Sequence, residues 1–238
     1  MAWQQKRRRL FPIIGRSILA IAGISFGCLA YTWAMLPDVR PLRQKMPETT
    51  AFMRIRGEEA AAAGRKPAFS QRIVRYGAIS PLLIRAVLVS EDAAFFSHDG
   101  VDYDELKESI ELNLEKGEFV RGASTITQQL AKNLYLSSAR NPYRKITELL
   151  ITRRLEAELP KTRILEIYLN VIEWGDGIWG VEAASQRYFG VSAGELSAEQ
   201  AALLAGAIPN PRLYSPARPS SGLLKRQQII LRRMSHTK

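Results

Sequence analysis

The sequence predicts a mainly α protein in which one transmembrane helix precedes a globular helical domain. Three observations lead to this prediction. An uncharged 20-residue run extends from Ser17 to Leu36. Helix-capping residues precede several apolar runs further along the chain. No run of alternating apolar and polar residues indicates a strand. The length of 238 residues suits one catalytic unit rather than two.

The uncharged run is long enough to cross a membrane. A helix rises about 1.5 Å per residue, so 20 residues span the roughly 30 Å hydrocarbon core of a bilayer. A basic head precedes the run, which predicts a cytoplasmic N-terminus and an exported remainder. A cleaved signal peptide is the weaker alternative, because the run is long and no A-x-A-like site follows it. The head contains Lys6, Arg7, Arg8, Arg9 and Arg16.

Charge and cysteine content narrow the classes of partner. The net charge of +11 indicates an anionic partner, such as lipid headgroups, a phosphorylated substrate or nucleic acid. In the predicted topology the domain faces the outer leaflet, so nucleic acid is excluded as a partner.

Cys28 is the only cysteine, and the fold therefore has no intrachain disulfide.

The chain divides into four predicted parts. Prolines, glycines and scattered basic residues between the apolar run and about residue 78 predict an irregular lead-in rather than a packed domain. The parts are a basic cytoplasmic head (1–16), a transmembrane helix (17–36), a lead-in (37–69) and a catalytic domain (70–238).

Capping signals place the helices of the domain. Ser80 with Pro81, and Asn141 with Pro142, each supply a cap and a first-turn proline. Ser197 and Gln200 have the spacing of a capping box. The helices are expected over Pro81 to Glu91, Tyr103 to Glu115, from just after Ser124, from Tyr143, from Thr162, from Glu199, and over Leu223 to Met234.

Two carboxylates stand at the end of the first of these helices. The segment EDAAFFSHDG begins with Glu91 and ends with Gly100. A carboxylate at the negative end of a helix dipole, beside Phe95 and Phe96, should have a raised pKa. Such a group can act as a general base. A solvated acidic helix end is the alternative.

Polar side chains and cations follow on two helices. The segment GASTITQQLAKN, residues 122–133, combines neutral donors with Lys132 at a helix start, which suits a sugar-phosphate anion. Arg140 can close on the same anion. Arg144, Lys145 and Glu148 share a helix face. An ordinary N-cap, a surface arginine and a local salt-bridge cluster are the respective alternatives.

Five ordered segments resemble the peptidoglycan glycosyltransferases, glycosyltransferase family 51. They are EDAAFFSHDG, GASTITQQLAKN, RKITE, KTRILEIYLN and GIWGVEAASQRYFG, and the resemblance covers about residues 70–215. It implies a lysozyme-like domain with a small membrane-proximal jaw lobe. No S-x-x-K or K-T-G element follows, so the chain resembles the monofunctional biosynthetic transglycosylases.

The resemblance also implies roles for particular residues. Glu91 matches the catalytic base, and Glu148 matches a second essential carboxylate. Thr147 stands where some relatives carry lysine. The implied phosphate-binding cations are Lys132, Arg140, Arg144 and Lys145. The implied polar cleft residues are Ser124, Gln128 and Gln129, and the first segment adds Asp92, Phe95 and His98.

The implied reaction polymerises lipid II into β-1,4 glycan strands and releases polyprenyl diphosphate. The implied partners are lipid II, the lipid-linked growing glycan, the membrane and cell-wall synthesis complexes. No organic cofactor is implied, and a divalent cation, Mg or Mn, stays open. The implied location is the bacterial inner membrane, with the catalytic domain periplasmic. The alternatives are a lysozyme-like lytic enzyme and a non-catalytic membrane-tethered wall-binding protein.

Overall fold

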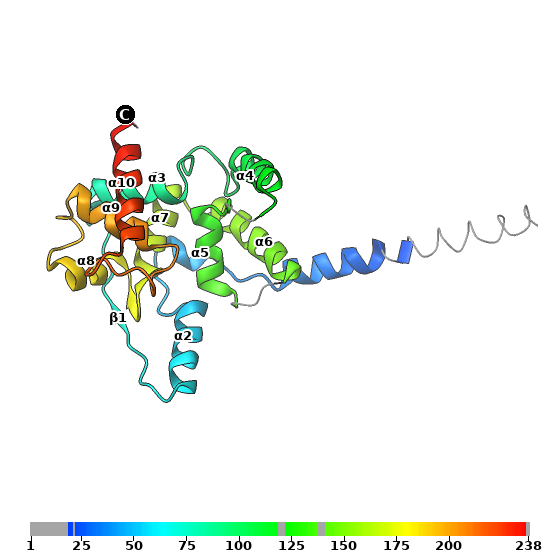
Figure 1. Cartoon of the computed structure of the whole chain (residues 1–238). Helices are drawn as coiled ribbons and strands as arrows, with labels where there is room; N and C mark the ends of the chain where they lie inside the picture. Colours follow the sequence, from blue (N-terminus) through cyan, green and yellow to red (C-terminus); the bar gives the residue numbers. More distant parts are fainter. Residues whose placement is uncertain (1–18, 21, 119–121, 138–140, 237–238) are drawn as a thin grey trace, which may run out of the picture. The chain divides into compact units, whose positions relative to one another are not determined.

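The protein divides into a short N-terminal unit and a larger helical unit. The computed structural model describes residues 19–20, 22–118, 122–137 and 141–236. The two compact units are Met1–Asp38 and Val39–Lys238. The second unit is built from helices with three short strands (Figure 1). The predicted mainly α class is therefore confirmed.

The N-terminal unit is helical where it is described. Residues 22–34 form a helix, and Phe26, Tyr31 and Trp33 are exposed on it. Among the described residues, no helix is both long and apolar enough to cross a bilayer. The basic head and part of the predicted span fall on residues 1–18 and 21, outside the described residues. The transmembrane helix stays a prediction.

Helix α7 (Lys161–Val171) forms the centre of the larger unit. Its buried residues cover more than one face of the helix, which is typical of a helix with neighbours on several sides. Helix α5 (Ile126–Tyr135) packs against it, and α2 (Ala51–Ala62) and α6 (Pro142–Glu158) pack against α5 (Figure 1). The buried residues of α7 are Ile164, Leu165, Ile167, Tyr168, Leu169, Asn170 and Val171.

A second group of helices supports α3 (Pro81–Glu91). Helix α9 (Ala198–Ala207) packs against both α3 and α10 (Ser221–His236). Two arginines of α10 fasten these contacts, because Arg233 donates to the Val89 carbonyl at 3.2 Å and Arg226 donates to the Gly206 carbonyl at 3.0 Å. Helices α9 and α10 thus hold the C-terminal end of α3 in position.

A small three-stranded sheet follows the C-terminal end of α7. Strand β3 (Ile178–Trp179) is central, pairing parallel to β1 (Ser70–Gln71) and antiparallel to β2 (Glu173–Gly175). The β2–β3 pair contains a register shift between Glu173 and Gly175. The remaining elements are α4 (Tyr103–Lys116), α8 (Val181–Phe189) and two 3₁₀ helices, η1 (Arg40–Arg43) and η2 (Tyr76–Ala78).

The structure confirms several predicted helix bounds and caps. Helix α3 has the predicted bounds. The Asn141 side chain caps α6 by accepting from the Arg144 backbone N–H at 2.7 Å. The capping box of Ser197 and Gln200 is present at α9. Side chains that hydrogen-bond within three residues can be predicted without tertiary information.

Other expectations were wrong. The supposedly irregular lead-in contains α2, an alanine-rich helix capped by the Thr50 side chain. Ser80 does not cap α3 with its side chain, because its hydroxyl donates to the Leu196 carbonyl at 3.1 Å. Helix α7 begins after Pro160 rather than at Thr162. At Ser80 a tertiary hydrogen bond takes the place of the predicted cap.

Gly100 ends the first predicted site segment in a conformation that excludes a side chain. Its φ is +87°, and a Cβ there would lie 2.7 Å from Thr152 Cγ2 and 2.9 Å from Glu156 Cγ. Both atoms belong to α6. The missing side chain therefore lets this segment approach α6 closely.

Replacing Gly100 by alanine should destabilise the fold more than replacing Gly117. Both glycines have positive φ, which costs alanine about 1–2 kcal/mol, but a Cβ at Gly117 meets nothing within 4 Å. We expect Gly100→Ala to lose a further 1–3 kcal/mol or so through overpacking. Thermal unfolding of the two full-length variants measures the difference. Equal losses of stability in the two variants would show that α6 can move away from the added Cβ without a measurable loss of free energy.

Candidate active site

Glu91, the last residue of α3, presents a half-buried carboxylate. Its Oε2 accepts from Gln129 Nε2 at 3.0 Å, and its Oε1 lies 3.3 Å from the Ser90 hydroxyl. Burial raises the pKa of this carboxyl, and the hydrogen bond from Gln129 and the charge of Arg226 only partly oppose that rise. The raised pKa expected from the sequence is confirmed, with burial as its main cause.

Tyr168 fixes the orientation of the Gln129 amide. The Tyr168 hydroxyl donates to Gln129 Oε1 at 2.8 Å, so the Nε2 end of the same amide faces Glu91. Tyr168 is fully buried, and burial together with the nearby Glu91 and Asp92 charges raises its pKa well above the usual value. The phenol therefore remains a donor. This role was not predicted, because the bond joins residues 39 positions apart in the chain.

Asp92 joins the end of α3 to the start of α5. Its Oδ2 accepts from the Ile126 backbone N–H at 2.9 Å, and its Oδ1 lies 2.9 Å from His98 Nε2. The first N–H groups of a helix have no partner within the helix, so this carboxylate supplies one. Asp92 is only 2% exposed. Its position brings Glu91 and Gln129 into contact.

His98 and Phe95 complete the support of this segment. The Gly100 backbone N–H donates to His98 Nδ1 at 3.1 Å, so the other ring nitrogen, Nε2, carries the proton and donates to Asp92. Phe95 is fully buried, and Lys161 Nζ lies 4.4 Å from its ring centroid. In this structure the polar atoms of Asp92 and His98 are occupied by protein partners.

The cluster of Asp92, His98 and Asp102 does not fit a divalent cation. Their ligand atoms lie within 4.8 Å of one another. However, both Asp92 oxygens and both His98 nitrogens already have partners. Asp102 Oδ1 also accepts from the Glu105 N–H at 2.8 Å, as the cap of α4. A metal-binding histidine must offer a lone pair, and His98 has none free.

Cations surround Glu148 on α6. Glu148 is 3% exposed. It accepts from Arg144 at 3.0 Å and from Lys145 at 2.5 Å, both within one helical turn. Two cations share one carboxylate, so the group keeps a positive surplus. Glu148 thereby holds the two cations in place.

Lys132 on α5 belongs to the same electrostatic group. Burial lowers its pKa most, Arg144 and Lys145 lower it further, and the Glu148 and Glu91 charges oppose that change. The charges of both carboxylates thus favour the protonated form of Lys132. Its Nζ lies 5.5 Å from the Phe52 ring centroid on α2. Arg140, the fourth predicted cation, lies outside the described residues.

The polar residues at the start of α5 have separate roles. Thr125 and Gln128 form a reciprocal capping box, and the Thr125 hydroxyl also donates to the Gly100 carbonyl at 2.7 Å. Gln128 is buried and used in that box, whereas Ser124 is exposed. Of the predicted amides, only Gln129 contacts a carboxylate of the site.

An apolar hollow of about 440 Å³ adjoins the cations. Ile146 and Leu149 of α6 are 47% and 38% exposed, while Glu148 between them is buried. They line the hollow with Tyr103, Leu106 and Ile110 of α4. Ser124, Gln128 and Lys145 also line it, so this apolar surface reaches the cationic group.

The comparisons decide the family. A family model described as transglycosylase matches residues 57–235, which is most of the chain. The chain belongs to the transglycosylase family. It is 52% identical, over 79% of its length and 83% of the relative's, to the biosynthetic peptidoglycan transglycosylase of Laribacter hongkongensis. It is 44% identical to the one of Chromobacterium violaceum, over 96% of its own length and 97% of the relative's.

This membership makes the protein a peptidoglycan glycosyltransferase, as the five sequence segments predicted. The half-buried carboxylate of Glu91 has the chemistry of a general base, and the cations of α5 and α6 have the chemistry to stabilise negative charge. The wall-binding alternative without catalysis does not explain this arrangement.

Tyr168→Phe should slow glycosyl transfer and alter its pH dependence. Without the phenol the Gln129 amide can turn, and Glu91 loses a fixed donor that lowers its pKa. The rate should fall at low pH as Glu91 is protonated, and this acidic limb of the pH–rate profile should therefore move to higher pH. Turnover should also fall by up to about tenfold, which corresponds to the free energy of one hydrogen bond. Steady-state rates across pH measure both effects.

Tyr76→Phe is the matched control, because Tyr76 is a half-buried tyrosine of η2 outside the site. Gln129→Met should reproduce the shift, and the double variant with Tyr168→Phe should add nothing to it. An unchanged limb in a folded Tyr168→Phe protein would reduce Tyr168 to a packing residue.

Proposed function

We propose that this enzyme polymerises lipid II, with Glu91 as the general base and the α5–α6 cations holding the diphosphate. The observation that carries the proposal is the position of Lys132 on α5, the helix whose Gln129 binds Glu91 and which packs against α6 with its Arg144, Lys145 and Glu148. A base for the acceptor and a binding group for the leaving anion thus lie beside one another.

In the proposed reaction the 4-hydroxyl of lipid II attacks the anomeric carbon of the lipid-linked glycan. Glu91 takes the hydroxyl proton as the new C–O bond forms. The bond from the anomeric carbon to the diphosphate breaks, and its electron pair leaves with the polyprenyl diphosphate. Lys132, Arg144 and Lys145 offset the growing negative charge. A single displacement inverts the anomeric carbon and yields a β-1,4 link.

The raised pKa of Glu91 suits this role. A general base works best when its pKa approaches the working pH, and burial moves Glu91 in that direction. The hydrogen bond from Gln129 leaves the second oxygen, Oε1, with only a long contact to Ser90. That oxygen is the proposed proton acceptor. A lytic enzyme needs no cationic group for a diphosphate, so the cations favour synthesis over cleavage.

The apolar hollow supports a lipid-linked substrate. Tyr103, Ile110 and Ile146 expose large apolar side chains on it, and contiguous exposed apolar surface marks lipid or protein contact. Lys145 belongs both to the hollow and to the cationic group. We place the first isoprene units of the lipid against this surface, with the diphosphate at the cations.

We also propose that the chain is a single-pass inner-membrane protein with a periplasmic catalytic unit. The basic head and the uncharged run of residues 17–36 support this topology. Tyr31 and Trp33 near the end of the run are exposed, as expected for aromatic residues at a membrane interface.

Glu91→Gln should abolish polymerisation while preserving the fold. Burial disfavours the ionised carboxylate, so this group withdraws stability as pH rises above its ordinary pKa of 4.5. A neutral amide should therefore not destabilise the protein at neutral pH. Loss of a positioned base lowers the rate by about 10² to 10⁴. Polymer formation from lipid II and thermal unfolding are the two measurements.

Two comparison variants sharpen this test. Asp99→Asn removes an exposed carboxylate of the same segment and should keep full activity. Glu148→Gln should lower turnover through displaced cations but keep the acidic limb of the pH profile. The base lies elsewhere if folded Glu91→Gln protein still polymerises with its acidic limb intact.

The topology can be tested with reporters fused after Lys238. Alkaline phosphatase, which matures only after export, should be active, and green fluorescent protein exported in the same way should stay dark. Removing residues 17–36 should reverse both signals. A fluorescent fusion of the intact chain would place the catalytic unit in the cytoplasm and refute the proposal.

A further inference from the structure

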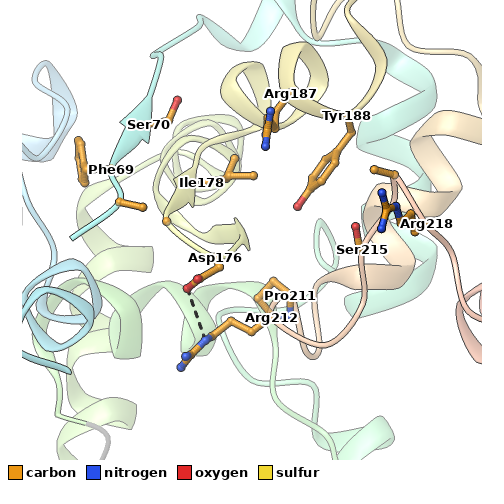
Figure 2. A pocket seen from close by; sticks show the side chains of 13 residues that line it. Phe69, Ser70, Asp176, Ile178, Arg187, Tyr188, Pro211, Arg212, Ser215 and Arg218 are labelled. Carbon is orange, nitrogen blue, oxygen red and sulfur yellow. Dashed lines mark ion pairs between the residues drawn. The ribbon is translucent and has the colours of Figure 1, made fainter. Parts of the chain in front are cut away.

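A second hollow lies beside the small sheet, among other elements than those that carry Glu91. We call it the arginine hollow, defined by Phe69, Ile178, Arg187, Tyr188, Arg212 and Arg218. It is about 780 Å³ in volume and lies between β1, the β2–β3 turn, α8 and the segment after α9 (Figure 2).

Two of its three arginines have no anionic partner among the residues that the structure describes. Arg212 is shared between Glu59 at 3.3 Å and Asp176 at 3.6 Å. Arg187 and Arg218 have no side-chain hydrogen bond or ion pair with any residue that the structure describes. Figure 2 shows Arg187 extending from α8 toward the hollow, and Arg218 at another side of the hollow. The hollow thus carries two guanidinium groups that are not neutralised.

The rest of the lining is suited to more than a small anion. Phe69 is 58% exposed, and Ile178 and Tyr188 add further apolar surface. Pockets of roughly 300–1,000 Å³ hold ligands of drug size, so a single phosphate would leave most of this volume unfilled. Guanidinium forks bind carboxylates and phosphates alike, and the volume of the hollow favours a ligand larger than a phosphate. The matching ligand is a short peptide with several carboxylates.

The hollow is connected through α7 to the helix position that carries Tyr168. Asn170 follows Tyr168 by two residues on α7, and its carbonyl accepts from Gln71 Nε2 at 3.0 Å. Ser70, the neighbour of Gln71 on β1, lines the hollow. A substrate strand bound at the proposed active site therefore has the arginine hollow on a directly connected element.

We propose that the arginine hollow binds the carboxylate-bearing stem peptide of the glycan strand that this enzyme elongates. The inference rests on the proposed function, because it takes the peptidoglycan strand as the bound polymer. Arg187 and Arg218 bind carboxylates, Tyr188 and Phe69 contact the apolar side chains, and Arg212 with Asp176 forms the polar edge.

The first test is direct binding. The probe is a soluble disaccharide–tetrapeptide with free carboxylates, titrated calorimetrically into the full-length protein in detergent. Arg187→Gln with Arg218→Gln should weaken binding by about tenfold or more, as the loss of charge-assisted bonds requires. Arg54→Gln with Arg232→Gln is the control, because it removes the same charge from exposed positions of α2 and α10.

Two further probes identify the ligand. The same disaccharide–tetrapeptide with amidated carboxylates should bind the native protein about tenfold more weakly, and inorganic phosphate should not displace the free-acid form. Equal binding of an unrelated acidic peptide would assign the hollow to a protein partner and overturn the proposal. Equal affinity of the Arg187/Arg218 variant and the native protein would also overturn it.

Kinetics separate this inference from the proposed function. With peptide-bearing lipid II, the Arg187/Arg218 variant should raise KM by about tenfold with little change in kcat. With a lipid-linked disaccharide that lacks the peptide, the variant and native enzyme should coincide. Absence of polymerisation by native protein would refute the proposed function. Native polymerisation with an unchanged KM in the variant would refute only the stem-peptide site.

Discussion

The paired hydrogen bonds of Asp92 hold the active site together. One oxygen binds the first N–H of α5 and the other binds His98, so the end of α3 and the start of α5 have a fixed spacing. Glu91 and Gln129, one on each side of this junction, meet at 3.0 Å as a result. A buried carboxylate with an unmet oxygen is costly, and this one has none. The cation group on α6 then follows from the packing of α6 on α5.

The parts of the fold that could be predicted are those specified by neighbouring residues. The Asn141 cap and the Ser197–Gln200 box connect atoms three residues apart, and both were found. The sheet could not be predicted, because strands of two or three residues are too short to show alternation. Ser70 pairs with Ile178, a contact that depends on the folding of the whole unit. Helix α2 was missed because prolines and glycines on both sides of it suggested a loop.

The same distinction applies to the site. Glu91, Lys132 and Glu148 were selected from ordered segments. In the structure Glu91 binds Gln129 of α5, the helix that carries Lys132, and α5 packs against α6, which carries Glu148. Tyr168 was not selected, because its bond to Gln129 joins residues 39 positions apart. Its segment looked like packing, and Tyr168 is indeed fully buried. The helix was expected to begin just after Ser124, but Thr125 is its cap, since both serine and threonine can cap a helix.

The inverted pattern of α6 sets a limit on how this enzyme can be improved in the laboratory. In its first turns Glu148 is buried while its neighbours Ile146 and Leu149 are exposed, the reverse of what a water-soluble helix prefers. Replacing those two by charged residues is the usual remedy for self-association during purification. Here the remedy removes the surface assigned to the lipid. Solubility and turnover therefore compete at the same positions, and a soluble variant should be engineered on some other face.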